Sequence, residues 1–114
     1  MASSAEFVQG TLDMLVLKAV SFTPQHGYSI LDWLRQITDH KLVIQDAALY
    51  PALHRLEARK LVSSEWGLSE NNRRAKYYQL TAAGRRALRA EHDSWQRYVG
   101  LVASVMNAQA PRSA

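Results

Sequence analysis

Residues 46–60 have the sequence DAALYPALHRLEARK, and this stretch decides the predicted fold. In a helix, Leu49, Leu53 and Leu56 fall on one narrow apolar stripe that suits a protein core. The opposite face carries small, aromatic and basic side chains, namely Ala47, Tyr50, His54, Arg55 and Ala58. Small residues and arginine suit the edges of base pairs, although any amphipathic helix also has a solvated outer face. The stretch therefore predicts a helix with one buried face and one face available to a partner.

The start of this helix is less regular. Asp46 is the expected N-cap, and a short strand is expected just before it at Leu42–Ile44. Pro51 lacks an N–H group and crowds the carbonyl group of Ala47, so the helix is expected to bend there or to start nearer Ala48. Pro51 either shapes the first turn for function or is a tolerated irregularity.

Two helices are expected before this stretch. Residues Gly10–Phe22 carry apolar side chains at helical spacing. Met14 and Leu17 lie off the main stripe, which indicates burial on more than one side, either as the central helix of the domain or against a second subunit. Thr23–Gly27 is a turn signal. The helix after it is expected to bury its apolar side chains, Tyr28, Ile30, Leu31, Leu34 and Ile37. Trp33 either packs at the core edge or is exposed at an interface.

After the central stretch the apolar spacing changes to a period of two. Leu61–Trp66 and Lys76–Thr81 alternate as strands do, and the turn-rich segment Gly67–Ala75 lies between them. This pattern predicts a β-hairpin with a basic tip.

A long final helix is expected from Ala82 to about Asn107, with Thr81 as its N-cap. Roughly 26 helical residues span about 39 Å, which is more than a compact domain of this size needs, so part of the helix must project. Its distal apolar residues would then be exposed, which favours a two-fold dimer through this helix or against the partner's first helix. The expected dimer contacts are Trp95, Val99, Val102 and Met106.

The charge is distributed unevenly along the 114 residues, whose net charge is +4. Residues 1–54 hold three Lys and Arg against five Asp and Glu, whereas residues 55–114 hold eleven against five. Between residues 73 and 89, six basic residues meet no acid. This polarity favours a polyanionic partner, because ordinary solvated surfaces usually mix both signs.

Several function classes lack support in the sequence. The absence of Cys excludes a disulfide framework and a thiolate metal site, and the four His residues show no metal-binding spacing. We find no nucleophile motif and no glycine-rich phosphate loop, so we expect neither an enzyme nor a cofactor. Without a long uncharged apolar run or a signal peptide, we expect a cytoplasmic protein and no membrane partner. If the polyanionic partner is DNA, the protein is expected to be nucleoid-associated.

The order helix, helix, short strand, helix, strand, loop, strand is that of a winged helix-turn-helix. We expect a mainly α fold with a small β-hairpin, in which the third helix enters the major groove and the hairpin reaches the phosphate backbone. The expected division is an N-terminal arm at 1–9, the DNA-binding domain at 10–81, a dimerisation helix at 82–108 and a disordered tail at 109–114. The expected DNA contacts are Ala48, Tyr50, His54 and Arg55 on the helix, and Arg73, Arg74 and Lys76 on the hairpin.

Five segments within residues 6–98 also carry a resemblance. They are GTLDMLVLKA at 10–19, HGYSI at 26–30, ALYPALHRLE at 48–57, RAKYYQLT at 74–81 followed by Gly84, and EHDSW at 91–95. Together they resemble the PadR family of bacterial transcriptional regulators, and the short C-terminal part resembles its small subfamily with one terminal helix. Leu42–Gln45 departs from the Ser/Pro-Gly-Thr turn of many members. The resemblance implies a homodimeric winged-helix repressor, and some members release DNA when a phenolic compound or a planar hydrophobic drug binds.

The expected function is therefore that of a homodimeric repressor bound to double-stranded DNA at a pseudo-palindromic operator. Two alternatives stay open. In one, two-fold-related Trp95 rings floor a pocket for a small aromatic effector, with Trp33 as a weaker candidate, although plain dimer packing also explains Trp95. In the other, the protein is a protein-interaction module, which would need an apolar outer face at 46–60, and Arg55 and Arg59 argue against that face.

Overall fold

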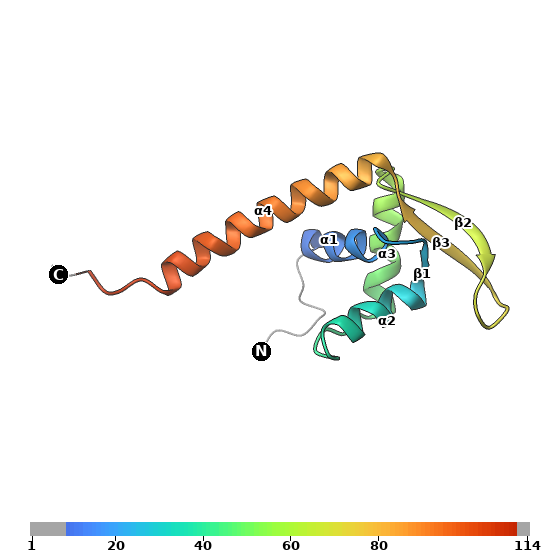
Figure 1. The fold of residues 1–114 in the computed structure, drawn as a ribbon, viewed down its shortest axis with the longest axis horizontal. Coiled ribbons are helices and arrows are strands. Elements are labelled where there is room, and N and C mark those ends of the chain that lie inside the picture. Colours follow the sequence, from blue (N-terminus) through green and yellow to red (C-terminus); the bar gives the residue numbers. More distant parts are fainter. Residues whose placement is uncertain (1–8, 112–114) are drawn as a thin grey trace.

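The computed structural model of the chain describes residues 9–111 (Figure 1). The elements in chain order are α1 (Gln9–Ala19), β1 (Gln25–His26), α2 (Gly27–Ile37), α3 (Asp46–Ala58), β2 (Val62–Leu68), β3 (Arg74–Leu80) and α4 (Ala82–Met106). Helices α1 to α3 form one body with the sheet beside it, and α4 projects away, so the predicted winged helix with a long C-terminal helix is confirmed. Except for Gln9, the expected N-terminal arm lies outside the described residues, as does the end of the expected tail.

The core forms where the apolar stripes of α1, α2 and α3 meet. Leu49, Leu53 and Leu56 of α3 are completely buried, as their spacing predicts. Helix α1 packs against α2, α3 and α4, which explains why Leu17 is buried although it lies off the main stripe. Burial on several sides makes α1 the central helix of the domain.

The sheet has three antiparallel strands in the order β1-β3-β2, one strand more than the expected hairpin. Val62 pairs with Leu80 in the hairpin, and Gln25 pairs with Tyr78 at the other edge of β3. The expectation of a simple turn at Thr23–Gly27 is therefore wrong, because its last residues add an edge strand. Two residues are too few to show an alternating pattern.

The segment before α3 also differs from expectation. No strand forms at Leu42–Ile44, where Ile44 instead contributes a buried side chain to the core from a loop. Asp46 is the first helical residue and Gln45 is the N-cap, without a side-chain hydrogen bond. An acidic residue in the first turn still suits the positive end of the helix dipole. The helix continues through Pro51, so a start nearer Ala48 is also wrong.

Helix α2 buries Gly27 at its start and the apolar side chains in its middle. Ile30, Leu31 and Leu34 are buried, whereas Tyr28 and Ile37 are 68% and 64% exposed, so the expected burial of these two residues is wrong. Tyr28 lies about 160° around the helix from Ile30. Ile37 shares the direction of Ile30 but is the last residue of the helix, at the end away from the buried middle.

An aromatic contact joins the segment after α1 to the second half of α2. Helix α1 ends at Ala19 and not at the expected Phe22. The Phe22 ring is exposed and lies 5.8 Å from the half-buried Trp33 ring. Trp33 therefore packs at the edge of the core.

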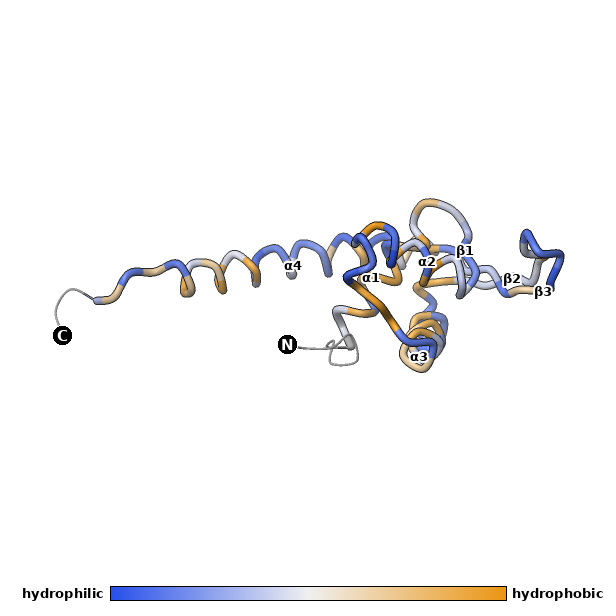
Figure 2. The backbone as a smooth tube through the Cα atoms, turned by 90° about the horizontal axis from the view of Figure 1, so that it is seen from below, coloured by the Kyte–Doolittle hydropathy of each residue, from blue (hydrophilic) through white to orange (hydrophobic). Residues whose placement is uncertain are grey.

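The start of α4 is hydrogen-bonded to, and packs against, the connection between α3 and β2. The Thr81 hydroxyl accepts a hydrogen bond from the Gly84 N–H, which confirms the expected N-cap, and donates one to the Lys60 carbonyl at 2.8 Å. Gly84 is buried, and a Cβ atom there would collide with the Leu61 carbonyl oxygen. From Arg89 onward, every described residue of α4 is exposed. Figure 2 shows this helix running away from the domain, with hydrophobic segments in its distal half.

Candidate nucleic-acid interface

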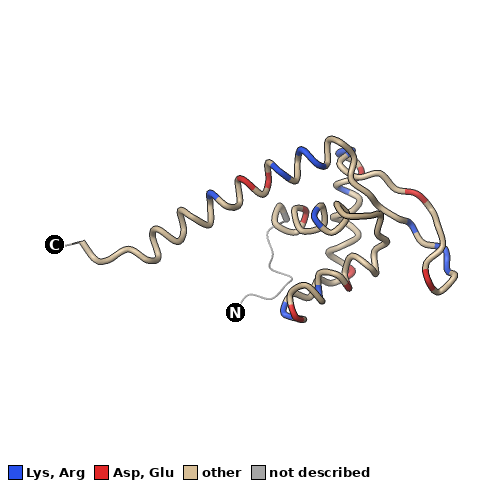
Figure 3. The backbone as a smooth tube through the Cα atoms, viewed as in Figure 1, with Lys and Arg blue, Asp and Glu red and all other residues tan. Residues whose placement is uncertain are grey.

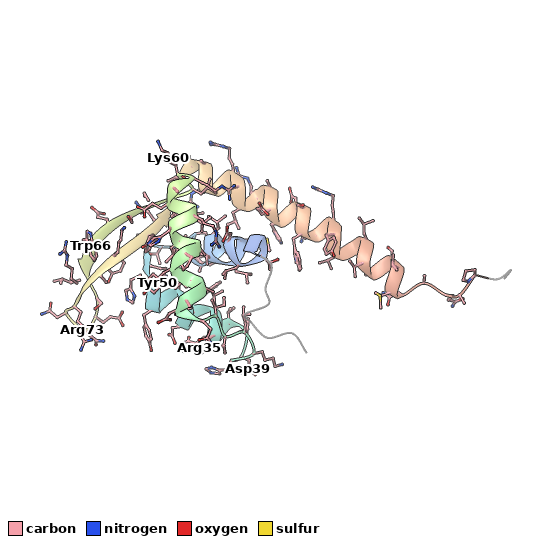
Figure 4. The ribbon with its side chains drawn as sticks, turned by 180° about the vertical axis from the view of Figure 1, so that it is seen from behind. Arg35, Asp39, Tyr50, Lys60, Trp66 and Arg73 are labelled. Carbon is pink, nitrogen blue, oxygen red and sulfur yellow. The ribbon has the colours of Figure 1, made fainter. Side chains whose placement is uncertain are left out.

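A groove of about 640 Å³ lies between α3 and the hairpin β2–β3, which we call the wing. Its walls come from the start of α2, from α3 and from the wing, and its lining includes His26, Tyr28, Tyr50, Trp66, Glu70, Arg73 and Arg74. Figure 4 shows Tyr50 on α3 and Trp66 and Arg73 on the wing. The fold thus brings part of the predicted helix set and the predicted wing set to one groove.

The outer face of α3 is only partly as expected. Tyr50 is 43% exposed and His54 is exposed, whereas Ala48 is half-buried against the core. The hydroxyl end of Tyr50 lies against Gly27, where a Cβ atom would overlap it. Tyr50 therefore packs across the start of α2 and still presents part of its ring to the groove.

Arg55 does not have the exposure that the helical wheel predicts. Its guanidinium donates to the Asp13 carboxylate at 2.8 Å, and the two side chains are 32% and 11% exposed. The Arg55 Nε atom is buried without a hydrogen-bond partner among residues 9–111. This ion pair fixes α3 against α1, which gives Arg55 a positioning role. Asp13 is the only acid in the apolar segment 10–22, and this acid is the feature of the sequence that could have indicated a buried ion pair.

The loop at the tip of the wing is short, and the wing carries exposed cations. Its loop is reduced to Ser69–Arg73, because both strands reach further than expected. The Ser69 N–H donates to the Arg73 carbonyl at 2.8 Å, and Asn72 has a φ of 58°, which asparagine tolerates. The Arg74 guanidinium lies 4.3 Å from the centre of the exposed Trp66 ring. This cation–π contact holds Arg74 beside the groove.

Lys76 is already engaged within the fold. Its ammonium lies 3.5 Å from the Glu57 carboxylate, which also accepts a hydrogen bond from the Ser64 hydroxyl. The Ser64 hydrogen bond, together with the Lys76 charge, lowers the pKa of Glu57 despite some desolvation. Burial raises the pKa of Tyr78 beside them. Lys76 is therefore less free for a phosphate than the sequence suggests.

Figure 3 marks Lys and Arg positions along the backbone, and several of them lie on the wing and along the first half of α4. One group lies on the wing and the other on the first half of α4, at Arg85, Arg86 and Arg89, which are exposed. Within residues 9–111 none of these three arginines forms an ion pair. Positive charge is thus present both on the wing and at the base of the projecting helix.

The distal half of α4 has a different surface. Trp95, Val99 and Val102 are between 41% and 44% exposed, and Met106 is 74% exposed. The ring of Trp95 lies 6.2 Å from that of Tyr98, and both border a depression of about 280 Å³ between α1 and α4. Trp33 belongs to the separate contact with Phe22 and does not line this depression, so a pocket shared by Trp33 and Trp95 does not form within one chain.

Two site classes find no counterpart in the described part of the chain. No group of three or more His, Asp or Glu side chains in residues 9–111 could hold a metal ion. Nor is any described helix long and apolar enough to cross a membrane.

Comparisons with known proteins agree with this geometry. Residues 16–90 match the sequence profile described as the transcriptional regulator PadR-like family. A transcriptional regulator of Mycobacterium tuberculosis is 34% identical over 84 residues, which cover 73% of this chain and 74% of that protein. The crystal structure of a PadR family transcriptional regulator from Eggerthella lenta is 33% identical, with a TM-score of 0.74 over 89% of this chain and 86% of the other. A transcriptional regulator from Clostridium thermocellum is 29% identical, with a TM-score of 0.73 over 87% and 92% of the two chains.

Proposed function

Because the chain belongs to the PadR-like family of transcriptional regulators, a DNA-binding and not an enzymatic family, we propose that it is a homodimeric repressor. Its short chain is consistent with the small subfamily. In this proposal residues 10–81 bind DNA and residues 82–108 form the dimer. Two copies of α3 enter successive major grooves of a pseudo-palindromic operator.

The dimer is supported by the unpartnered apolar side chains of α4. Between Tyr98 and Pro111 the sequence contains no Asp, Glu, Lys or Arg, and its large apolar residues are exposed in the single chain. Monomers rarely expose such a contiguous patch. We propose that Trp95, Val99, Val102 and Met106 pack on their two-fold mates or on the partner's α1.

DNA docking is supported above all by the placement of the basic wing beside the outer face of α3. Tyr50 and His54 are the proposed base contacts, with Ala48 at the margin of the interface. Arg73 and Arg74 are the proposed phosphate contacts, and Lys76 joins them only in competition with Glu57. Arg55 sets the angle of α3 through Asp13 and does not itself read bases.

Binding to duplex DNA as a function of salt tests this proposal. The logarithm of the binding constant should fall by about 0.9 per phosphate contact for each tenfold increase in salt. Arg73→Ala and Arg74→Ala should each weaken binding to all sequences and reduce that slope by about one contact per subunit. Arg97→Ala is the matched control, because it removes the same charge from exposed α4. Binding that does not change with salt, or equal losses in all three variants, would contradict the proposed docking.

A second candidate function rests on the depression beside Trp95 and Tyr98. If a flat aromatic effector enters it in the dimer, such a compound should quench Trp95 fluorescence and weaken DNA binding. Trp95→Phe should abolish that quenching, while Trp33→Phe should leave it unchanged. Quenching that persists in Trp95→Phe would place the effector elsewhere.

A further inference from the structure

We propose that His26 donates a hydrogen bond to a phosphate oxygen of bound DNA, and that the Glu70 carboxylate of the wing lies near this donor in the free protein. The inference rests on the proposed DNA binding and adds a neutral phosphate contact to it. His26 was not among the residues that the sequence predicted for DNA contact.

The hydrogen bonds of His26 determine which ring nitrogen faces outward as a donor. His26 is the N-cap of α2, and its Nδ1 atom accepts the Ser29 N–H at 3.2 Å. An accepting nitrogen carries no hydrogen, so the hydrogen of the neutral ring is on Nε2. The Ser29 hydroxyl donates to the His26 carbonyl at 2.9 Å and closes the same turn. The cap therefore leaves Nε2–H as the only free donor of the ring.

The surrounding residues hold this donor in place. The His26 backbone pairs with Tyr77 in the sheet, and the two rings meet edge to face with their centres 5.3 Å apart. Only 12% of the His26 side chain is exposed, and it is part of the lining of the groove between α3 and the wing. A donor held this rigidly loses little conformational entropy when it binds an acceptor.

The structure also shows what kind of ligand this donor attracts. A Glu70 carboxylate oxygen lies 3.8 Å from His26 Nε2, too far for a good hydrogen bond, and the Glu70 side chain is 91% exposed. An exposed contact of this kind contributes little, so a competing anion displaces it readily. Arg73 and Arg74 line the same groove, which makes anionic oxygen the matching ligand chemistry.

Duplex DNA supplies such an oxygen when α3 occupies a major groove. A phosphate in the protein groove between α3 and the wing would accept the hydrogen bond from His26. It would also be attracted by the positive charges of Arg73 and Arg74, which line the same groove. Glu70 must then move away, and its like charge near the backbone opposes binding. The Glu70 carboxylate at the wing tip thus lowers the affinity for DNA, because it lies near His26 in the free protein and must move before a phosphate can bind.

The test uses His26→Asn in the 114-residue chain with a mixed-sequence duplex of about 30 base pairs. Asparagine keeps the N-cap acceptor but removes the outward ring donor. We expect a loss of affinity of about fivefold per subunit, equal on all sequences. The salt slope should stay that of the wild type, because a neutral donor releases no counterion, whereas Arg73→Ala reduces it. Unchanged thermal unfolding checks that the cap is intact.

Glu70→Gln provides an independent arm that leaves the cap of α2 untouched. It should raise affinity by about twofold to threefold, and this gain should shrink in the His26→Asn background. Glu65→Gln makes the same charge change on β2 outside the groove lining and should gain less. The inference is overturned if His26→Asn binds DNA with wild-type affinity, or if Glu70→Gln and Glu65→Gln gain affinity equally. In either case, salt-dependent binding by the wild type would still support the proposed function. If the wild-type protein does not bind the duplex, the proposed function itself fails.

Discussion

The wing and the distal half of α4 lie at opposite ends of the molecule and expose side chains of opposite character. The wing exposes the cations Arg73 and Arg74 and the aromatic Trp66, with the acids Glu65 and Glu70 among them, and both arginines border the groove beside α3. Beyond Arg97, α4 exposes aliphatic and aromatic side chains without a single charge (Figure 3). A cationic surface suits a polyanion, whereas an apolar one suits another protein surface. One chain therefore has two surfaces that suit two different partners.

These two ends are coupled through the start of α4. The Thr81 hydroxyl donates a hydrogen bond to the carbonyl group of Lys60, two residues after α3, and Gly84 lies against the carbonyl group of Leu61. The direction of α4 relative to α3 is thus fixed by backbone contacts. In the proposed dimer, the packing of α4 would then set the separation of the two α3 helices.

The largest expected effect comes from breaking this junction. Gly84→Ala places a methyl group on the Leu61 carbonyl oxygen, and neither backbone can move without shifting α4. We expect the free energy of unfolding to fall by about 3 kcal/mol in urea denaturation. Gly100→Ala is the matched control, since its Cβ atom meets nothing within 4 Å and alanine favours the helix. Equal stability changes in the two variants would contradict the coupling.

The second-largest expected effect is on dimerisation, through the apolar distal half of α4. Val102→Glu places a charge in the proposed dimer interface and should raise the dimer dissociation constant by about 100-fold in sedimentation equilibrium. Ser104→Glu adds the same charge about 200° around the helix and should leave the dimer intact. If Val102→Glu remains as dimeric as the wild type, α4 does not form the interface in the proposed way.

A third prediction concerns the ion pair that positions α3. Arg55→Met leaves the Asp13 carboxylate without its partner in the core and should lower the free energy of unfolding by about 2 kcal/mol. Asp13→Leu combined with Arg55→Met should recover most of that loss, because no charge then stays buried. Additive losses in the double variant, measured by chemical denaturation, would show that the pair does not act as a unit.

The parts of this fold that the sequence predicts are those determined by local periodicity. Leu49, Leu53 and Leu56 show the buried face of α3, and the length of Ala82–Met106 shows that α4 must project. Each signal lies within one element and repeats several times. Repetition is what makes a pattern stronger than the preference of any single residue.

The parts that the sequence does not predict depend on contacts between distant residues. Arg55 faces outward on a helical wheel, and only the packing of α1 brings Asp13 within 2.8 Å of it. His26 looks like part of a turn until its pairing with Tyr77 places it in the sheet. Both residues belong to the proposed interface or to its support, so periodicity alone yields an incomplete site.

A smaller effect is expected at the end of α3. Lys60 has a φ of 61°, a left-handed conformation that strains a side chain with a Cβ atom, and the Leu61 N–H closes the helix on the Leu56 carbonyl. Lys60→Gly should raise the free energy of unfolding by about 0.5 to 1 kcal/mol. Lys60→Ala removes the same charge but keeps the strain, so thermal unfolding should show no comparable gain.

The smallest effect is the pH dependence that Glu57 contributes, and it tests whether Lys76 serves the fold or the DNA. The hydrogen bond from Ser64 and the Lys76 charge lower the pKa of Glu57 below its ordinary value of 4.5. The carboxylate therefore stabilises the folded state above pH 4.5, and this contribution is lost as the pH falls through the lowered pKa. About a third of each side chain is exposed, so solvent screening keeps the effect small. The difference in unfolding free energy between wild type and Glu57→Gln should therefore shrink below pH 4.5. At neutral pH the variant should bind DNA more tightly and with a steeper salt dependence, because Lys76 no longer pairs with Glu57 and can contact a phosphate. An unchanged slope would assign Lys76 to the fold alone and leave Arg73 and Arg74 as the phosphate contacts of the wing.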